Sequence, residues 1–335
     1  MRTLLKKVGF FIERIMKKLE ATLINLFMWG ELFSTQGVRD TTIIQCEGFV
    51  FEFRQQDIKL KQSEYINKTI LTTIVTVRDI TEEQILQILE IIDDICWLLS
   101  FAQQAPICRH SYKIDNLEIE SRNCASFIIN SPAYIIENRG KFIRNFIEQV
   151  YPTYKELKNS RELEVVFGYL IEINKPNLAM ETKLIISYVL MEHLKRTYAE
   201  IIGYIKTDTQ FEHPQYLDLE IQPNDIENYE FKKSKGKPCY RHKKFGKCGS
   251  TEMIKRTFED AGVPRTKTTS IIDKRNTMIH EGLLLPFGNT KYTNQALIDF
   301  QEVNDLLRKY LLSILNYKGE YYLSHDRFSC SGRLL

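Results

Sequence analysis

Three residues that could act on a phosphodiester lie close together near the C-terminal end of the chain. Arg275 and Asn276 are adjacent, and His280 follows within the next turn of a predicted helix over residues 270–281. A guanidinium stays charged at any working pH, whereas an imidazole titrates near neutrality. The first can neutralise phosphate oxygens and the second can move a proton, which is what phosphodiester cleavage without a metal requires. Gly282 is the expected C-cap of this helix.

The spacing of Arg275 and His280 places them about 140° apart around a helix axis. They therefore do not share one face, and a single straight helix would not present them as a compact site. A cleft between two copies of the helix would bring an arginine and a histidine from each subunit together, so the spacing predicts a homodimer. A purely structural alternative also exists, because a cationic side chain near a helix C-terminus is favoured without any catalytic role.

The chain from Pro132 onward has mainly helical patterning. The longest and most apolar segment covers residues 178–205 and carries two acidic candidates, Glu181 and Glu192. Other predicted helices cover 141–151, 161–173, 250–262 and 293–317. Residues 131–176 are expected to connect the two halves, 177–320 to form an all-helical domain, and 321–335 to be a tail. A polar insertion at 207–249 interrupts the helical domain and is expected to be irregular.

The front portion, residues 37–130, has a different pattern. Residues 41–53 and 68–77 are rich in β-branched and aromatic residues and predict strands, with a turn or bulge at Gly48. Thr81 then caps a predicted helix that extends to about residue 102. The expected fold class is therefore α+β, a small mixed α/β N-terminal portion followed by an all-α bundle.

Residues 1–36 combine charged positions with apolar residues at helical spacing and predict an amphipathic N-terminal helix. The longest uncharged stretch of this segment, residues 21–30, is about half the length of a membrane span, so no stable membrane insertion is expected. No signal-peptide pattern is evident, and seven scattered cysteines in a chain of 335 residues suit reduced thiols. A cytoplasmic location is the resulting expectation.

The insertion carries a strongly basic segment. Residues 231–248 contain eight lysines or arginines and no acidic residue, although the net charge of the whole chain is only +3. Cations suit phosphates, and aromatic rings can stack on unpaired bases. RNA is therefore the expected partner, and the alternative is a solvated loop. The candidate RNA-binding residues are Lys232, Lys233, Lys235, Lys237, Tyr240, Arg241, Lys243, Lys244, Phe245 and Lys247.

The same insertion contains residue types that bind zinc, at Cys239, His242 and Cys248. A second matched pair is missing, and His213 is the only nearby fourth candidate, so a metal is not expected. No glycine-rich phosphate loop occurs, which removes support for nucleotide hydrolysis. No cofactor is expected.

Taken together, the motifs resemble the HEPN domains of the ApeA-like group. The resemblance rests on an apolar helix ending in Leu190-Met191-Glu192-His193-Leu194, a long polar insertion, and Arg275-Asn276-x-x-x-His280 followed by Glu281-Gly282. It covers roughly residues 178–317. The front portion is weakly similar to the N-terminal domain that accompanies this group.

The resemblance implies a metal-independent endoribonuclease, of the kind used as a toxin or antiphage-defence effector. Such an enzyme uses the RNA 2′-hydroxyl as nucleophile and leaves a 2′,3′-cyclic phosphate. The family's catalytic roles transfer onto Arg275, Asn276 and His280, and the acidic role onto Glu192, with Glu181 as its competitor. The alternative is a HEPN-fold module that senses RNA or a nucleotide without cutting it.

Overall fold

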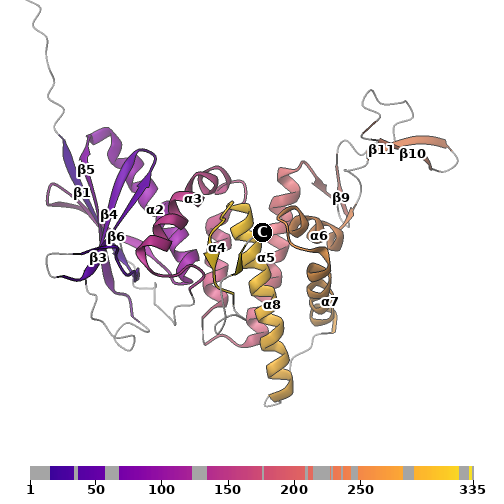
Figure 1. Cartoon of the computed structure of the whole chain (residues 1–335). Helices are drawn as coiled ribbons and strands as arrows, with labels where there is room; N and C mark the ends of the chain where they lie inside the picture. Colours follow the sequence, from indigo (N-terminus) through magenta and orange to yellow (C-terminus); the bar gives the residue numbers. More distant parts are fainter. Residues whose placement is uncertain are drawn as a thin grey trace, which may run out of the picture. The chain divides into compact units, whose positions relative to one another are not determined.

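The computed structural model describes residues 16–33, 37–56, 68–122, 134–175, 177–207, 210–213, 227, 229–234, 237–242, 248–281, 290–323 and 332–333. These residues form an α+β protein (Figure 1). The chain divides into two compact units. The first comprises Met1–Cys96, Ile107–Ile129 and Arg139–Arg144, and the second comprises Trp97–Pro106, Asn130–Asn138 and Asn145–Leu335.

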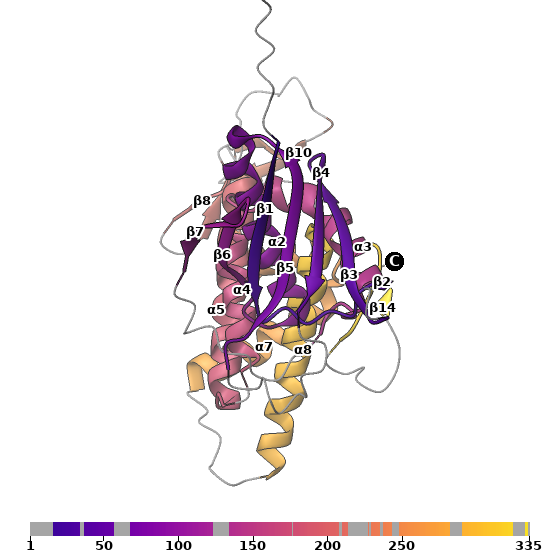
Figure 2. The same cartoon turned by 90° about the vertical axis from the view of Figure 1, so that its left-hand side faces the viewer.

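The first unit is built on an antiparallel sheet of seven strands. Its order is β2-β3-β4-β5-β1-β6-β7, and Figure 2 shows most of these strands side by side. The strands are β1 (Lys17–Ile24), β2 (Leu32–Phe33), β3 (Arg39–Cys46), β4 (Phe49–Gln55), β5 (Leu71–Ile80), β6 (Cys108–Ile114) and β7 (Leu117–Ser121). Only β1 breaks the sequential order, because it lies between β5 and β6 and pairs antiparallel with both.

The strands predicted between residues 41 and 53 are confirmed as the β3–β4 hairpin. Glu47 and Gly48 form its two-residue turn with φ values of 51° and 81°. Two consecutive residues with positive φ suit the right-handed twist of a hairpin, and glycine adopts such a conformation without strain. In β4, Phe51 and Phe53 are buried while Arg54 is exposed, which is the alternation of a sheet with one covered face.

The predicted N-terminal helix is wrong for residues 17–24, which form strand β1. Leu19, Ala21 and Leu23 are all fully buried, whereas Glu20 and Thr22 are partly exposed. That period of two matches a strand, and it lay within a longer run of apolar residues that also fitted helical spacing. Residues 1–15 of the predicted helix lie outside the described part of the chain.

A helix begins where Thr81 predicted one. The Thr81 backbone N–H donates to Gln84 Oε1 at 2.9 Å at the start of a short 3-10 turn, η1 (Glu82–Gln84), which continues into α2 (Ile85–Gln103). The first part of α2 lies against the sheet of the first unit. Arg109 of β6, only 2% exposed, donates from Nε and Nη2 to the two carboxylate oxygens of Asp93, both at 2.9 Å. This bidentate pair neutralises a buried guanidinium.

The second unit is mainly helical. It contains most of α3 (Gly140–Leu157), together with α4 (Leu163–Ile173), α5 (Met180–Ile201), α6 (Ser250–Asp260), α7 (Arg265–Glu281) and α8 (Thr290–Ile314). Helix α5 packs against α4, α6 and α8, while α7 packs against α6 and α8.

Helix α3 is longer than its sequence pattern predicts. It continues through Pro152, where a proline removes one backbone hydrogen bond, to Leu157. Tyr154 lies beyond the proline, is fully buried, and stacks on Phe167 with ring centroids 6.0 Å apart. Phe101 stacks on the same Phe167 at 4.9 Å, so packing against an aromatic core offsets the lost bond.

The expectation of an irregular insertion in an otherwise all-helical domain is wrong for the described residues. Strands β8 (Ile205–Lys206), β9 (Gln210–Glu212) and β12 (Cys248–Gly249) form one small sheet, and β10 (Tyr229–Ser234) pairs with β11 (Lys237–His242). A further pair, β13 (Glu320–Tyr321) and β14 (Gly332–Arg333), occupies part of the expected tail. The polar and charged composition of the insertion did not predict these short strands. The buried aromatic residue Phe211 of β9 packs in an apolar cluster with Cys248 of β12 and helps to stabilise this sheet.

None of the described helices is both long enough and apolar enough to span a membrane.

Candidate functional site

Two helices of the second unit carry the predicted site residues. Glu192 lies on α5, whose buried positions include Tyr188, Met191 and Lys195. Arg275, Asn276 and the backbone of His280 lie on α7, which is one continuous helix from Arg265 to Glu281. The helical part of the sequence prediction for this segment is therefore confirmed, although α7 begins five residues earlier, directly after Pro264.

A carboxylate from α5 meets the guanidinium from α7. Arg275 Nη2 donates to Glu192 Oε1 at 2.8 Å. Arg275 Nη1 donates to the side-chain oxygen of Asn276 at 2.9 Å. The arginine side chain is only 18% exposed, and its Nε is buried with no hydrogen-bond acceptor among the described residues. Helix α5 thus fixes the guanidinium, while hydrogens on both Nη atoms and on Nε remain for another acceptor.

The second oxygen of Glu192 accepts a hydrogen bond from a lysine that was not predicted as a site residue from the sequence. Lys195 Nζ donates to Glu192 Oε2 and, at 2.6 Å, to Ser250 Oγ at the start of α6. The Lys195 residue is 5% exposed, and its ammonium also lies 5.3 Å from the centre of the Phe211 ring. One carboxylate therefore joins two cations, Arg275 and Lys195, at the junction of α5, α6 and α7.

A buried tyrosine adjoins this cluster. Burial raises the pKa of Tyr188 to about 12, the carboxylates of Asp299 and Glu302 add to the rise, and Arg275 opposes it. Lys274 binds both carboxylates, with Nζ 2.7 Å from Asp299 Oδ1 and 2.6 Å from Glu302 Oε2. Burial lowers the pKa of Lys274, but these hydrogen bonds outweigh burial and leave it raised. Tyr188 is thus a neutral hydroxyl at physiological pH.

Of the two acidic candidates, the structure places Glu192 at Arg275. Glu181 lies in the first turn of α5, eleven residues earlier, which is about 16 Å along the helix axis. The side chain of His280 lies outside the described part of the structure, so its position relative to Arg275 stays a prediction.

The neighbouring imidazole on α5 belongs to a different cluster. His193 Nε2 lies 3.3 Å from Glu162 Oε2, which also accepts a hydrogen bond from Arg196 Nη2 at 2.8 Å. Burial lowers the pKa of His193, although Glu162 works in the opposite direction. His193 therefore lies toward the start of α4 and contributes no described contact to Glu192 or Arg275.

The basic segment of the insertion is partly described. Its backbone forms the β10–β11 hairpin, which contains Lys232, Lys233, Lys237, Tyr240 and Arg241. In the ladder Phe231 lies opposite Tyr240, and Phe231 is 57% exposed. The other predicted RNA-binding positions, Lys235, Lys243, Lys244, Phe245 and Lys247, lie outside the described residues.

Of the residues considered for zinc, the structure describes the side chains of Cys248 and His213. Cys248 is buried in an apolar cluster with Tyr204, Phe211 and Met253, and burial raises the pKa of its thiol. His213 Nε2 lies 3.0 Å from the carbonyl oxygen of Ile202. No group of three or more potential metal ligands occurs among the described residues.

Two residues of the charged cluster were not predicted from the sequence, Lys195 and Ser250. Lys195 follows Glu192 by three positions, the spacing at which opposite charges meet on a helix, so this signal was present. Ser250 had no comparable signal, because its contact spans the whole insertion.

Comparisons of the chain with protein-family models, with curated proteins and with solved structures found no match.

Proposed function

We propose that this protein is a metal-independent endoribonuclease of the HEPN type, acting as a toxin or antiphage-defence effector. The observation that carries the proposal is the Glu192–Arg275 ion pair. It joins the two segments on which the resemblance rests, and these are separated by 83 positions. An arginine with no role on α7 would not need a carboxylate partner from the long apolar helix α5, yet Glu192 lies within hydrogen-bond distance of Arg275.

In the proposed reaction, His280 removes the proton from an RNA 2′-hydroxyl, whose oxygen then attacks the adjacent phosphorus. The bond to the 5′-oxygen breaks and that oxygen takes up a proton, which leaves a 2′,3′-cyclic phosphate. Arg275 stabilises the charge that grows on the phosphoryl oxygens. Asn276 orients the phosphate or the imidazole, and Glu192 holds the guanidinium in place.

The second candidate function is a HEPN-fold module that binds RNA or a nucleotide without cutting it. One observation favours it, namely that both Nη atoms of Arg275 already donate to protein oxygens, Glu192 Oε1 and Asn276 Oδ1. A guanidinium held in this way can bind an anion through its remaining hydrogens without stabilising the transition state of a cleavage reaction. The two functions differ in whether RNA is consumed.

We further propose that the protein acts as a homodimer through α5. Ile185 and Val189 are 50% and 48% exposed, and they share a helical face with Glu192 at spacings of four and three residues. Exposed apolar side chains on the same face of a helix can be buried against a second protein surface. A second copy on this face would bring two Glu192–Arg275 clusters together and would resolve the 140° separation of Arg275 and His280.

Placing a charge in that face is expected to separate the subunits. The Val189→Glu protein should sediment as a monomer at micromolar concentration, where the wild type sediments as a dimer. Burying an unpaired carboxylate in the interface would cost a large desolvation free energy. Val165→Glu on α4 is the matched control, since Val165 is similarly exposed at 47%. A wild-type protein that sediments as a monomer would contradict the composite site.

The basic insertion is proposed to bind the RNA substrate. Phe231 and Tyr240, opposed in the β10–β11 ladder, supply rings for unpaired bases, and the lysines and arginine of the segment supply charge for phosphates.

The described cysteines, Cys46, Cys96, Cys108 and Cys248, form no disulfide bonds, which suits the reducing cytoplasm as the proposed location.

The proposed activity is tested by incubating the full-length protein with single-stranded RNA, and with DNA of the same sequence, in EDTA. We expect cleavage of the RNA alone, because DNA lacks the 2′-hydroxyl nucleophile, and products ending in a 2′,3′-cyclic phosphate. RNA that is bound but intact would support the sensor instead. Cleavage of both polymers would contradict the proposed chemistry.

A further inference from the structure

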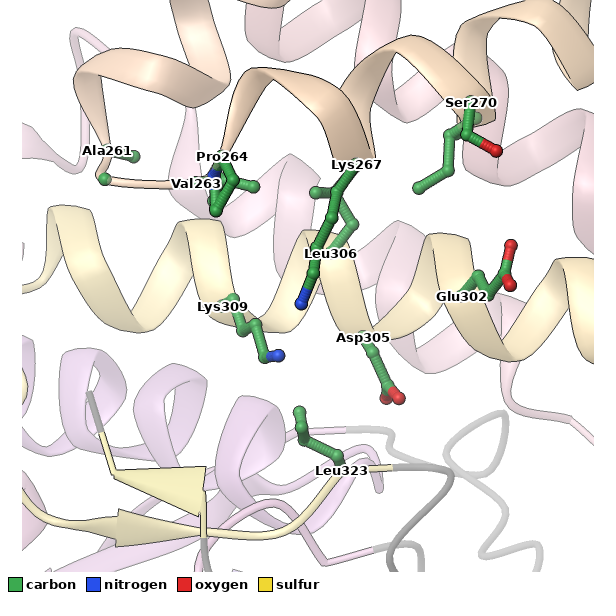
Figure 3. Close-up of a pocket in the computed structure, with 12 residues that line it drawn as sticks. Ala261, Val263, Pro264, Lys267, Ser270, Glu302, Asp305, Leu306, Lys309 and Leu323 are labelled. Carbon is green, nitrogen blue, oxygen red and sulfur yellow. The ribbon is translucent and has the colours of Figure 1, made fainter. Parts of the chain in front are cut away.

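A cavity of about 440 Å³ lies between the start of α7, the middle of α8 and Leu323, within the second unit (Figure 3). This volume falls within the range of pockets that hold small organic ligands. Arg275 and Glu192 do not line it, so the cavity is separate from the proposed catalytic cluster.

The walls of the cavity are largely apolar. Val263 and Pro264 line it from the loop before α7, Leu306 from α8, and Leu323 from the opposite side (Figure 3). Val263 and Leu306 are themselves 5% and 4% exposed, so they form a firm hydrophobic wall. An aliphatic or flat ligand body would be removed from water there, which stabilises binding in proportion to the apolar area covered.

Two lysines bring positive charge to the same space. The ammonium groups of Lys267 on α7 and Lys309 on α8 both point toward the gap above Leu323 (Figure 3). The start of α7 adds to this field, because the first backbone N–H groups of a helix favour an anion and the first turn of α7 has no acidic residue.

Each of the two carboxylates that line the cavity also has a cation outside the lining close to it. Glu302 Oε2 binds Lys274 Nζ at 2.6 Å, and Asp305 Oδ1 lies 3.9 Å from Arg308 Nη1. Their remaining lone pairs, with the Ser270 hydroxyl, can meet hydroxyl or amino groups of a ligand. A ligand that combines an anionic group with an apolar body therefore matches the lining.

We propose that this cavity binds a small organic anion, with its phosphate or carboxylate at Lys267 and Lys309 and its apolar body against Val263, Pro264, Leu306 and Leu323. The inference does not rest on ribonuclease activity. The ligand would contact α7, the helix that carries Arg275. The shared chemistry has two natural sources, a nucleotide and a fatty acid.

The test is isothermal titration calorimetry, which measures the dissociation constants of the full-length protein for adenosine monophosphate, octanoate and inorganic phosphate. We expect saturable binding of one of the two organic anions at least about 10-fold tighter than inorganic phosphate. The double variant Lys267→Ala/Lys309→Ala should weaken that binding by about 10-fold or more, because charge-assisted hydrogen bonds to the anion are lost. Lys318→Ala, which removes an exposed lysine outside the lining, should bind as the wild type does.

Ser270→Phe provides a second variant, because it fills the cavity without altering any charge and its position is exposed. It should weaken binding as the double variant does. The proposal is overturned if neither organic anion binds, if inorganic phosphate binds as tightly, or if the double variant and Ser270→Phe both bind as the wild type does. Circular dichroism of each variant confirms that a loss of binding is not a loss of fold.

Discussion

Replacing Arg275 by alanine is expected to lower the rate of RNA cleavage by about 10²–10³-fold, the usual effect of removing one group that stabilises developing charge. Arg275 is held at 2.8 Å by Glu192 and at 2.9 Å by Asn276, so its guanidinium is oriented before substrate arrives. The measurement is single-turnover cleavage of a labelled RNA in EDTA. Arg275→Lys should recover only part of the rate, because an ammonium keeps the charge without the planar fork.

The matched control is Arg265→Ala, on the same helix. Arg265 pairs at the surface with Glu252 and Glu259, so its loss should change stability little and leave the cleavage rate within about twofold of wild type. An Arg275→Ala protein that cleaves at the wild-type rate would exclude the proposed role of this arginine.

Replacing Glu192 by alanine is expected to lower the free energy of unfolding by about 2 kcal/mol. The substitution leaves Lys195, 5% exposed, with Ser250 as its remaining described hydrogen-bond partner, and it leaves Arg275 without a carboxylate. Breaking a buried pair by removing one partner costs about 3–5 kcal/mol, and the partial exposure of Glu192, 33%, reduces that figure. Urea denaturation followed by circular dichroism measures the change.

Glu200→Ala is the control for that measurement. Glu200 lies on the same helix and pairs with Arg196, but its side chain is 56% exposed, so the expected loss is below about 1 kcal/mol. Equal losses for the two variants would mean that Glu192 contributes no more than a surface ion pair. A double-mutant cycle with Arg275→Ala should give a coupling of about 1 kcal/mol, because the two residues are in direct contact.

Local chemistry made much of the fold predictable. The β3–β4 hairpin followed from β-branched residues on either side of Gly48, and the start of the helix after Thr81 followed from a capping residue. The errors arose where tertiary contacts decide. The segment around Leu19 satisfied both helical and strand spacing, and only pairing with β5 and β6 selects the strand. Likewise, packing of Tyr154 on Phe167 carries α3 past Pro152.

The site was predictable only in part for the same reason. The residue types at Arg275 and Glu192 indicated a charged site. The long apolar helix limited the candidates for the acidic residue of this site to two. Periodicity could not choose between Glu181 and Glu192, because that choice depends on how α5 and α7 pack. Ser250 had no local signal at all, since it reaches Lys195 from the far end of the insertion.

The central claim is that the α7 segment from Arg275 to His280 cuts RNA, and the most direct measurement is cleavage by wild type and His280→Ala in EDTA. His110→Ala, on β6 of the other unit, is the matched control. We predict that wild type and His110→Ala cleave equally, while His280→Ala loses at least about 100-fold in rate, as expected for removal of a general base. Intact RNA with the wild-type protein, or undiminished cleavage by His280→Ala, would contradict the claim.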